Sequence, residues 1–120
     1  MTPEAFSALA ARLGEGVQVQ PVLDTVQFKV GGKAFATLGW PEAGWAIVKL
    51  TPRDQAAAMS LSDAVTPEPG RRRNSGVTLL RLERADAAVV ASVLAAAFTH
   101  AYRGASVRRA AAAATVARGR

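Results

Sequence analysis

The arginines are the residues of this 120-residue chain that point most clearly to a chemical role. Three arginines stand together at Arg71, Arg72 and Arg73, just before a predicted strand. Each guanidinium presents planar donors that suit phosphate oxygens, so this run predicts contacts with a phosphate backbone. A loop that carries charge only for solubility is the alternative interpretation.

More arginines gather at the C-terminal end. Residues 103–120 hold five arginines and no acidic residue, whereas residues 1–102 hold ten basic and nine acidic residues. The formal net charge of +6 therefore belongs almost entirely to this tail. We expect the tail to be a basic arm for nucleic acid, with Arg103, Arg108 and Arg109 among its phosphate contacts. A solvated extension without a partner is the alternative, and the composition leaves helical and disordered states open.

Two lysines are predicted to extend this basic surface. Lys29 alternates with Val26, Phe28 and Val30 along a predicted strand, so its side chain is expected on the solvent face. Lys33 is expected at the tip of a hairpin, although lysines there also guard a sheet against edge pairing. The predicted nucleic-acid site thus comprises Lys29, Lys33, Arg71, Arg72, Arg73, Arg103, Arg108 and Arg109.

The other reactive residue types are scarce or scattered. The chain has no cysteine and one histidine, which excludes disulfides, thiolate sites and a multi-histidine metal centre. His100 is expected near the C-terminal end of a helix, where the helix dipole explains it. No pair of acidic residues has the spacing of a catalytic site. We therefore expect no enzymatic activity, no cofactor, no metal and no small-molecule substrate.

Two tryptophans, Trp40 and Trp45, flank a turn at residues 41–44. An exposed ring at Trp40 would suit stacking on a nucleic-acid base. The preferred interpretation is that both rings pack over the core, because large aromatic side chains dominate core energetics.

Length and hydropathy bound the class of protein. A chain of 120 residues is expected to form one domain. The sequence contains no run of 18 apolar residues, so no membrane span is expected. The N-terminus lacks the pattern of a signal peptide, so a cytoplasmic location is expected. Alanine and arginine stand where isoleucine and lysine are common, which suggests a GC-rich bacterial genome.

The first half of the chain predicts a helix followed by a three-stranded antiparallel meander. The helix begins at Thr2-Pro3-Glu4 and ends at Gly14 and Gly16, and residues 17–24 are a connector with some strand character because Pro21 interrupts them. The expected strands are residues 25–30, 33–38 and 45–50, with Gly31-Gly32 as a hairpin turn.

The second half predicts a capped helix, a late strand and a long helix. Thr51 caps a helix that runs to about Ser60, and a short edge strand is possible near residues 64–66. A strand follows at residues 77–83, and a helix from Asp86 to about Tyr102 ends at Gly104. The order α-β-β-β-α-(β)-β-α indicates an α+β fold, a two-layer antiparallel sheet packed by helices.

Three segments in this order resemble the MmcQ/YjbR-like family. Residues 26–36 are similar to the family's F-x-V-x-G-K-x-F-A hairpin, residues 45–50 to its third strand, and residues 76–82 to its late strand. The resemblance covers about residues 4–103 and implies a compact α+β domain at residues 1–103, with residues 104–120 as a separate basic tail rich in alanine and arginine. It also implies DNA binding through a double-wing arrangement. An aromatic residue is common in the family at the start of the late strand, where this chain has Ser75-Gly76-Val77.

The residues and the resemblance together predict a small, non-enzymatic protein that binds DNA through phosphate contacts, largely independent of sequence. The alternative is a protein-interaction module that uses the face or an edge of its sheet and has no role with nucleic acid.

Overall fold

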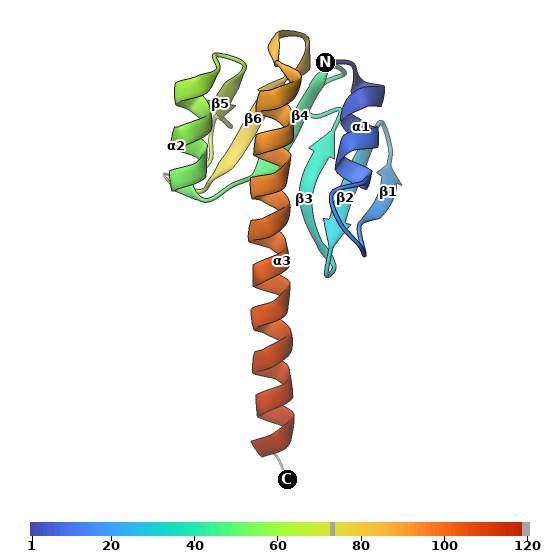
Figure 1. The fold of residues 1–120 in the computed structure, drawn as a ribbon, viewed down its shortest axis with the longest axis vertical. Coiled ribbons are helices and arrows are strands. Elements are labelled where there is room, and N and C mark those ends of the chain that lie inside the picture. Colours follow the sequence, from blue (N-terminus) through green and yellow to red (C-terminus); the bar gives the residue numbers. More distant parts are fainter. Residues whose placement is uncertain (73, 119–120) are drawn as a thin grey trace.

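A curved antiparallel sheet forms one layer of the protein and three helices form the other. The computed structural model describes residues 1–72 and 74–118, and the side chains of residues 1–72 and 74–107. The strands are β1 (Gln18–Val22), β2 (Thr25–Val30), β3 (Lys33–Leu38), β4 (Trp45–Lys49), β5 (Val65–Pro67) and β6 (Val77–Arg81). They lie in the order β1-β2-β3-β4-β6-β5 (Figure 1).

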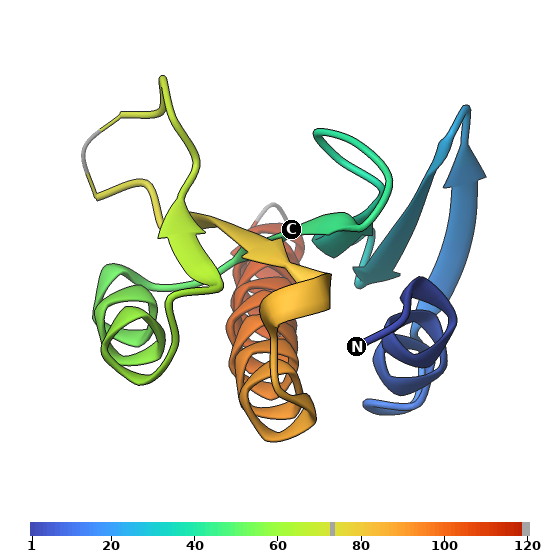
Figure 2. The same cartoon turned by 90° about the horizontal axis from the view of Figure 1, so that it is seen from above.

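The helices are α1 (Pro3–Ala11), α2 (Pro52–Leu61) and α3 (Ala87–Arg118), with a short 3₁₀ turn at Leu82–Arg84. Figure 2 shows all three on the same face of the sheet, with α3 between α1 and α2. No helix of the described residues lies on the opposite face. The expected α+β class and two-layer arrangement are confirmed.

The core lies between the helices and the covered face of the sheet. Alternate strand residues such as Phe28, Val48 and Leu80 are fully buried there. Phe6 of α1 meets Phe28 edge-on with ring centroids 6.1 Å apart, and Phe98 of α3 meets Phe35 in the same way at 5.6 Å. These aromatic pairs attach the first and last helices to the central hairpin.

All three helices begin where the sequence predicts. The Thr51 hydroxyl accepts a hydrogen bond from the Asp54 amide at 3.1 Å, and Thr2 caps α1 in the same way through Ala5. The side chain of Gln55 then donates to the Thr78 hydroxyl at 2.9 Å, which ties α2 to β6.

Strand β1 is a difference from the sequence prediction. Residues 18–22 were expected in a connector, but they pair with β2 from Gln18↔Lys29 to Val22↔Thr25. Pro21 is tolerated because β1 lies at the sheet edge, where one flank has no neighbouring strand to receive a hydrogen bond.

The end of the last helix is a second difference. The prediction that this helix ends at Gly104 is wrong, because α3 continues to Arg118. A helical glycine costs only about 1 kcal/mol relative to alanine. Ala105, the next residue, is 3 % exposed, and a Cβ placed on Gly31 would lie 2.4 Å from the Ala105 Cβ. The packing of α3 on the β2–β3 turn thus extends past Gly104. Beyond it the helix projects from the sheet (Figure 1).

Candidate nucleic-acid interface

The connections between elements fall at two ends of the sheet. Because neighbouring strands are antiparallel, residues 12–17, 31–32, 50–51 and 68–76 lie at one end, and α3 leaves the sheet there. Residues 23–24, 39–44, 62–64 and 82–86 lie at the other end, where α1 and α3 begin. The two ends differ sharply in charge.

The first end, called the basic end below, gathers most of the described cations. Its described side chains include eight basic residues, Arg12, Lys29, Lys33, Lys49, Arg53, Arg71, Arg72 and Arg103. The acidic side chains there are Glu15, Asp54 and Glu68. The α3 extension, residues 106–118, leaves from this end and adds Arg108, Arg109 and Arg118 to its sequence.

The second end, called the acidic end below, has the opposite balance. Its acidic residues are Glu4, Asp24, Glu42, Asp63, Glu83 and Asp86, and its described basic residues are Arg81 and Arg84. Arg81 is partly engaged, because its guanidinium lies 5.7 Å from the ring centroid of Trp45 and 2.7 Å from the Glu83 carboxylate.

The two predicted lysines share the basic end but not one face of the sheet. Lys29 pairs with Ala34, and Val30 pairs with Lys33. Residues paired directly across a sheet share a face, and successive residues along a strand alternate. Lys29 therefore lies on the open face, as expected, whereas Lys33 lies on the face that carries the helices.

The arginine run occupies the long loop between β5 and β6. Figure 2 shows this loop rising on the side of the sheet away from the helices. Arg71 pairs with the carboxylate of Glu68, which neutralises part of its charge. Arg72 is exposed. Arg73, the third predicted contact, lies outside the described residues.

The remaining predicted arginines belong to α3. Arg103 is exposed and lines a shallow hollow of about 210 Å³ between α3 and the start of α2, together with Thr51 and His100. The side chains of Arg108 and Arg109 lie outside the described ones, and the helix backbone continues through both positions. Arg53, in the first turn of α2, was missed by sequence reasoning. It belongs to the basic end because α2 begins there. The sequence could have indicated this, because Arg53 closely follows a predicted strand that runs toward that end.

The tryptophans lie less deeply than expected. Trp40 is 50 % exposed, so the prediction that its ring packs over the core holds only in part. Trp45 is half-buried beneath Arg81 on the open face, so the prediction that its ring packs over the core is wrong. Trp40 belongs to the acidic end, so its ring lies away from the cations of the basic end.

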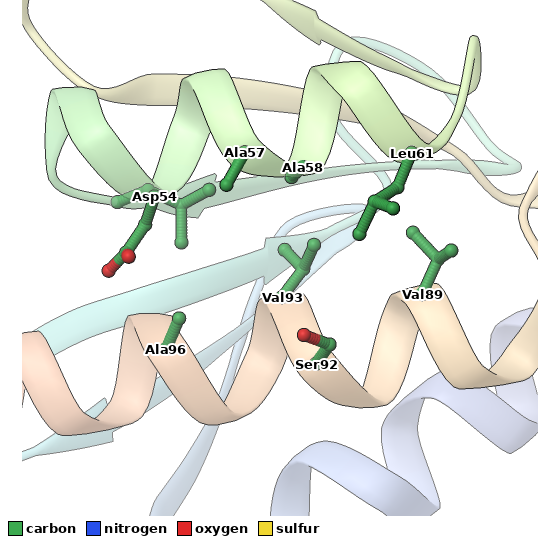
Figure 3. A pocket seen from close by; sticks show the side chains of 9 residues that line it. Asp54, Ala57, Ala58, Leu61, Val89, Ser92, Val93 and Ala96 are labelled. Carbon is green, nitrogen blue, oxygen red and sulfur yellow. The ribbon is translucent and has the colours of Figure 1, made fainter.

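The groove between α2 and α3 is lined mainly by apolar side chains (Figure 3). Leu61 and Val93 face one another across it, and Asp54 stands at one end. Its volume of about 90 Å³ is well below the roughly 300 Å³ at which pockets for small molecules begin. We interpret it as a packing gap between two helices.

Among residues 1–72 and 74–118, no three histidine, aspartate or glutamate side chains gather in a way that would hold a metal ion. No helix in the described part of the chain is long and apolar enough to cross a membrane. No family model, no curated protein and no solved structure matches this chain.

Proposed function

We propose that this protein is a non-enzymatic, cytoplasmic DNA-binding protein that contacts phosphates with its basic end. The observation that carries the proposal is the segregation of charge. Eight described cations stand against three acids at one end of the sheet, and six acids stand against two cations at the other. Such a field draws a polyanion to one end of the molecule and repels it from the other. The resemblance to the MmcQ/YjbR-like family supports the same function.

The shape of the basic end fits a duplex better than a small anion. Lys29 and Lys33 place cations on both faces of this end of the sheet. The α3 extension projects from the same end (Figure 1). An α-helix with its side chains is about 10–12 Å wide, close to the roughly 12 Å width of the major groove. The α3 extension is rich in alanine, whose side chain has no hydrogen-bonding group for a base edge, so we propose binding that is largely independent of sequence.

Salt dependence of binding tests this function with a matched pair of variants. Arg53→Ser with Arg103→Ser removes two charges from the basic end, and Arg81→Ser with Arg84→Ser removes two from the acidic end. Each phosphate contact contributes about 0.9 to the slope of log K against log salt on duplex DNA. The first variant should flatten the slope by about 1.8, and the second should leave it unchanged.

Fluorescence anisotropy with a labelled duplex, measured at several salt concentrations, provides the slopes. Absence of binding to duplex and single-stranded DNA at low salt contradicts the function. Equal losses in the two variants contradict the assignment to the basic end.

The exposed sheet edge favours one second candidate function, a module that binds another protein by strand addition. Strand β1 is exposed at every position from Gln18 to Val22. A partner strand would pair there and not with the cations. Two results together would favour this candidate. The protein would bind no DNA, and it would form a stable complex with a protein partner that survives the Arg53→Ser and Arg103→Ser changes.

A further inference from the structure

The acidic end carries an apolar patch, formed by Val22, Leu23 and Trp40. Leu23 is 100 % exposed and Trp40 is half exposed. The three side chains flank an open hollow of about 550 Å³, which Asp24 and Glu42 also line. Figure 2 shows its two walls, the β1–β2 turn and the loop before β4, rising from the face of the sheet without helices.

The backbone at Leu23 is as unusual as its exposure. Its φ angle is +55°, a left-handed conformation that costs a non-glycine residue about 1–2 kcal/mol. A fully exposed leucine in this conformation contributes nothing to the fold of its own chain. Strain and exposed apolar surface together are typical of a contact site.

The α3 extension has the complementary chemistry. It continues for 13 residues beyond Ala105, about 20 Å of helix, and Figure 1 shows it projecting past the sheet. Its sequence has no acid and three arginines, and alanine fills most of the rest. Small side chains allow close approach to an apolar surface, and the arginines suit the carboxylates that line the hollow.

We propose that the apolar patch and hollow of one copy of this chain bind the α3 extension of a second copy. The two surfaces are different, so the contact is heterologous and each chain offers one of each. Repetition of such a contact makes an open chain of subunits or a closed ring, of which the smallest is a pair that exchanges its extensions. This contact needs no nucleic acid. It uses the same α3 extension as the proposed DNA contact, so duplex DNA and a second copy of the chain would compete for that helix.

Two full-length variants break the contact from opposite sides. The patch variant combines Leu23→Gly, Asp24→Asn and Glu42→Gln, and glycine keeps the turn because it favours positive φ. The extension variant combines Arg108→Glu and Arg109→Glu. A control variant combines Leu61→Ser, Glu4→Gln and Asp63→Asn, which removes an exposed leucine and two charges from the acidic end outside the hollow.

Sedimentation equilibrium without nucleic acid measures the self-association. Protein concentrations from about 10 µM to about 1 mM cover the range of a transient interface. The wild-type mass should rise above 12.5 kDa with concentration, and more so at low salt. The control should behave like the wild type, and the patch and extension variants should each associate at least about tenfold more weakly. An equal mixture of those two variants should form one-to-one pairs only, because each pair has one intact contact.

Three outcomes overturn the proposal. They are a wild-type protein that stays monomeric up to about 1 mM, a control that loses as much association as the patch variant, and a mixture that stays monomeric. The patch variant should retain the salt slope of DNA binding, so failure here and failure of the proposed function are distinguishable.

Discussion

Strand β2 has a two-residue turn at each of its ends. Both turns contain a left-handed backbone conformation, but different residue types adopt it. At the basic end the turn residues are Gly31 and Gly32, with φ angles of +60° and +79°. At the acidic end they are Leu23 and Asp24, and Leu23 has a φ of +55°. The first turn packs against α3, whereas the Leu23 side chain is fully exposed. Glycine thus stands where the fold needs close approach, and a strained leucine stands where the chain makes no contact of its own.

The turn at Leu23-Asp24 is stabilised by the side chain of Thr25 and not by that of Leu23. The Thr25 hydroxyl donates a hydrogen bond to the Val22 carbonyl at 2.7 Å, across the base of the turn. The β1–β2 register therefore does not depend on leucine, and Leu23 is free to change without loss of the hairpin. Substitutions in the two turns test this contrast.

Gly31→Ala should give the largest effect, a loss of about 2–3 kcal/mol in the free energy of unfolding. The left-handed backbone costs alanine about 1 kcal/mol or more, and the new Cβ would lie 2.4 Å from the Ala105 Cβ. Urea denaturation measures the loss. Ala105→Gly in the same chain should recover part of it, and additive effects of the two changes would contradict the contact.

Gly32→Ala is the matched change beside it and should cost about 1 kcal/mol. Its φ is also in the left-handed region, but none of the described atoms lies within 4 Å of the added Cβ. The same denaturation series measures it. A loss as large as that of Gly31→Ala would show that backbone strain, and not the α3 contact, dominates the basic-end turn.

Leu23→Gly should act in the opposite direction and raise the free energy of unfolding by about 0.5–1 kcal/mol. The gain from relieved strain is reduced by the greater freedom of glycine in the unfolded chain. Thermal unfolding of dilute, monomeric protein gives the value. A clear destabilisation would mean that the leucine side chain stabilises its own chain.

Leu23→Asn should produce the smallest change, a gain of a few tenths of a kcal/mol. Asparagine tolerates the left-handed region better than leucine but not as well as glycine. Its stability should fall between those of the wild type and Leu23→Gly. A value outside that interval would contradict backbone strain as the cause.

Much of the fold could be predicted from local patterns. Alternation and the Gly31-Gly32 turn placed the central hairpin, although its pairing shifts by one residue between Phe28 and Lys29. Thr51 placed the start of α2, because its side chain caps the helix locally. Strand β1 was obscured by Pro21, whose acceptability depends on the edge position of the strand. The passage of α3 through Gly104 depends on a tertiary contact between Ala105 and Gly31.

The candidate site could be predicted only in its residue types. Lys29 and Lys33 were expected on one basic face, but the pairing of Val30 with Lys33 puts them on opposite faces. The partner of Arg71 at Glu68 follows from the conformation of a loop that has no repeating pattern. The gathering of cations at one end depends on strand direction, which joins residues far apart in the sequence.

The division of charge between the ends makes the whole molecule an electric dipole. The described residues extend over 54 Å along the long axis, with acids gathered where α3 begins and cations where it leaves the sheet. A particle of this kind turns in the field of a charged surface before it touches that surface. With an isoelectric point near 11.1 it should bind a cation exchanger strongly. It should also be retarded on an anion exchanger at low salt, held by its opposite end.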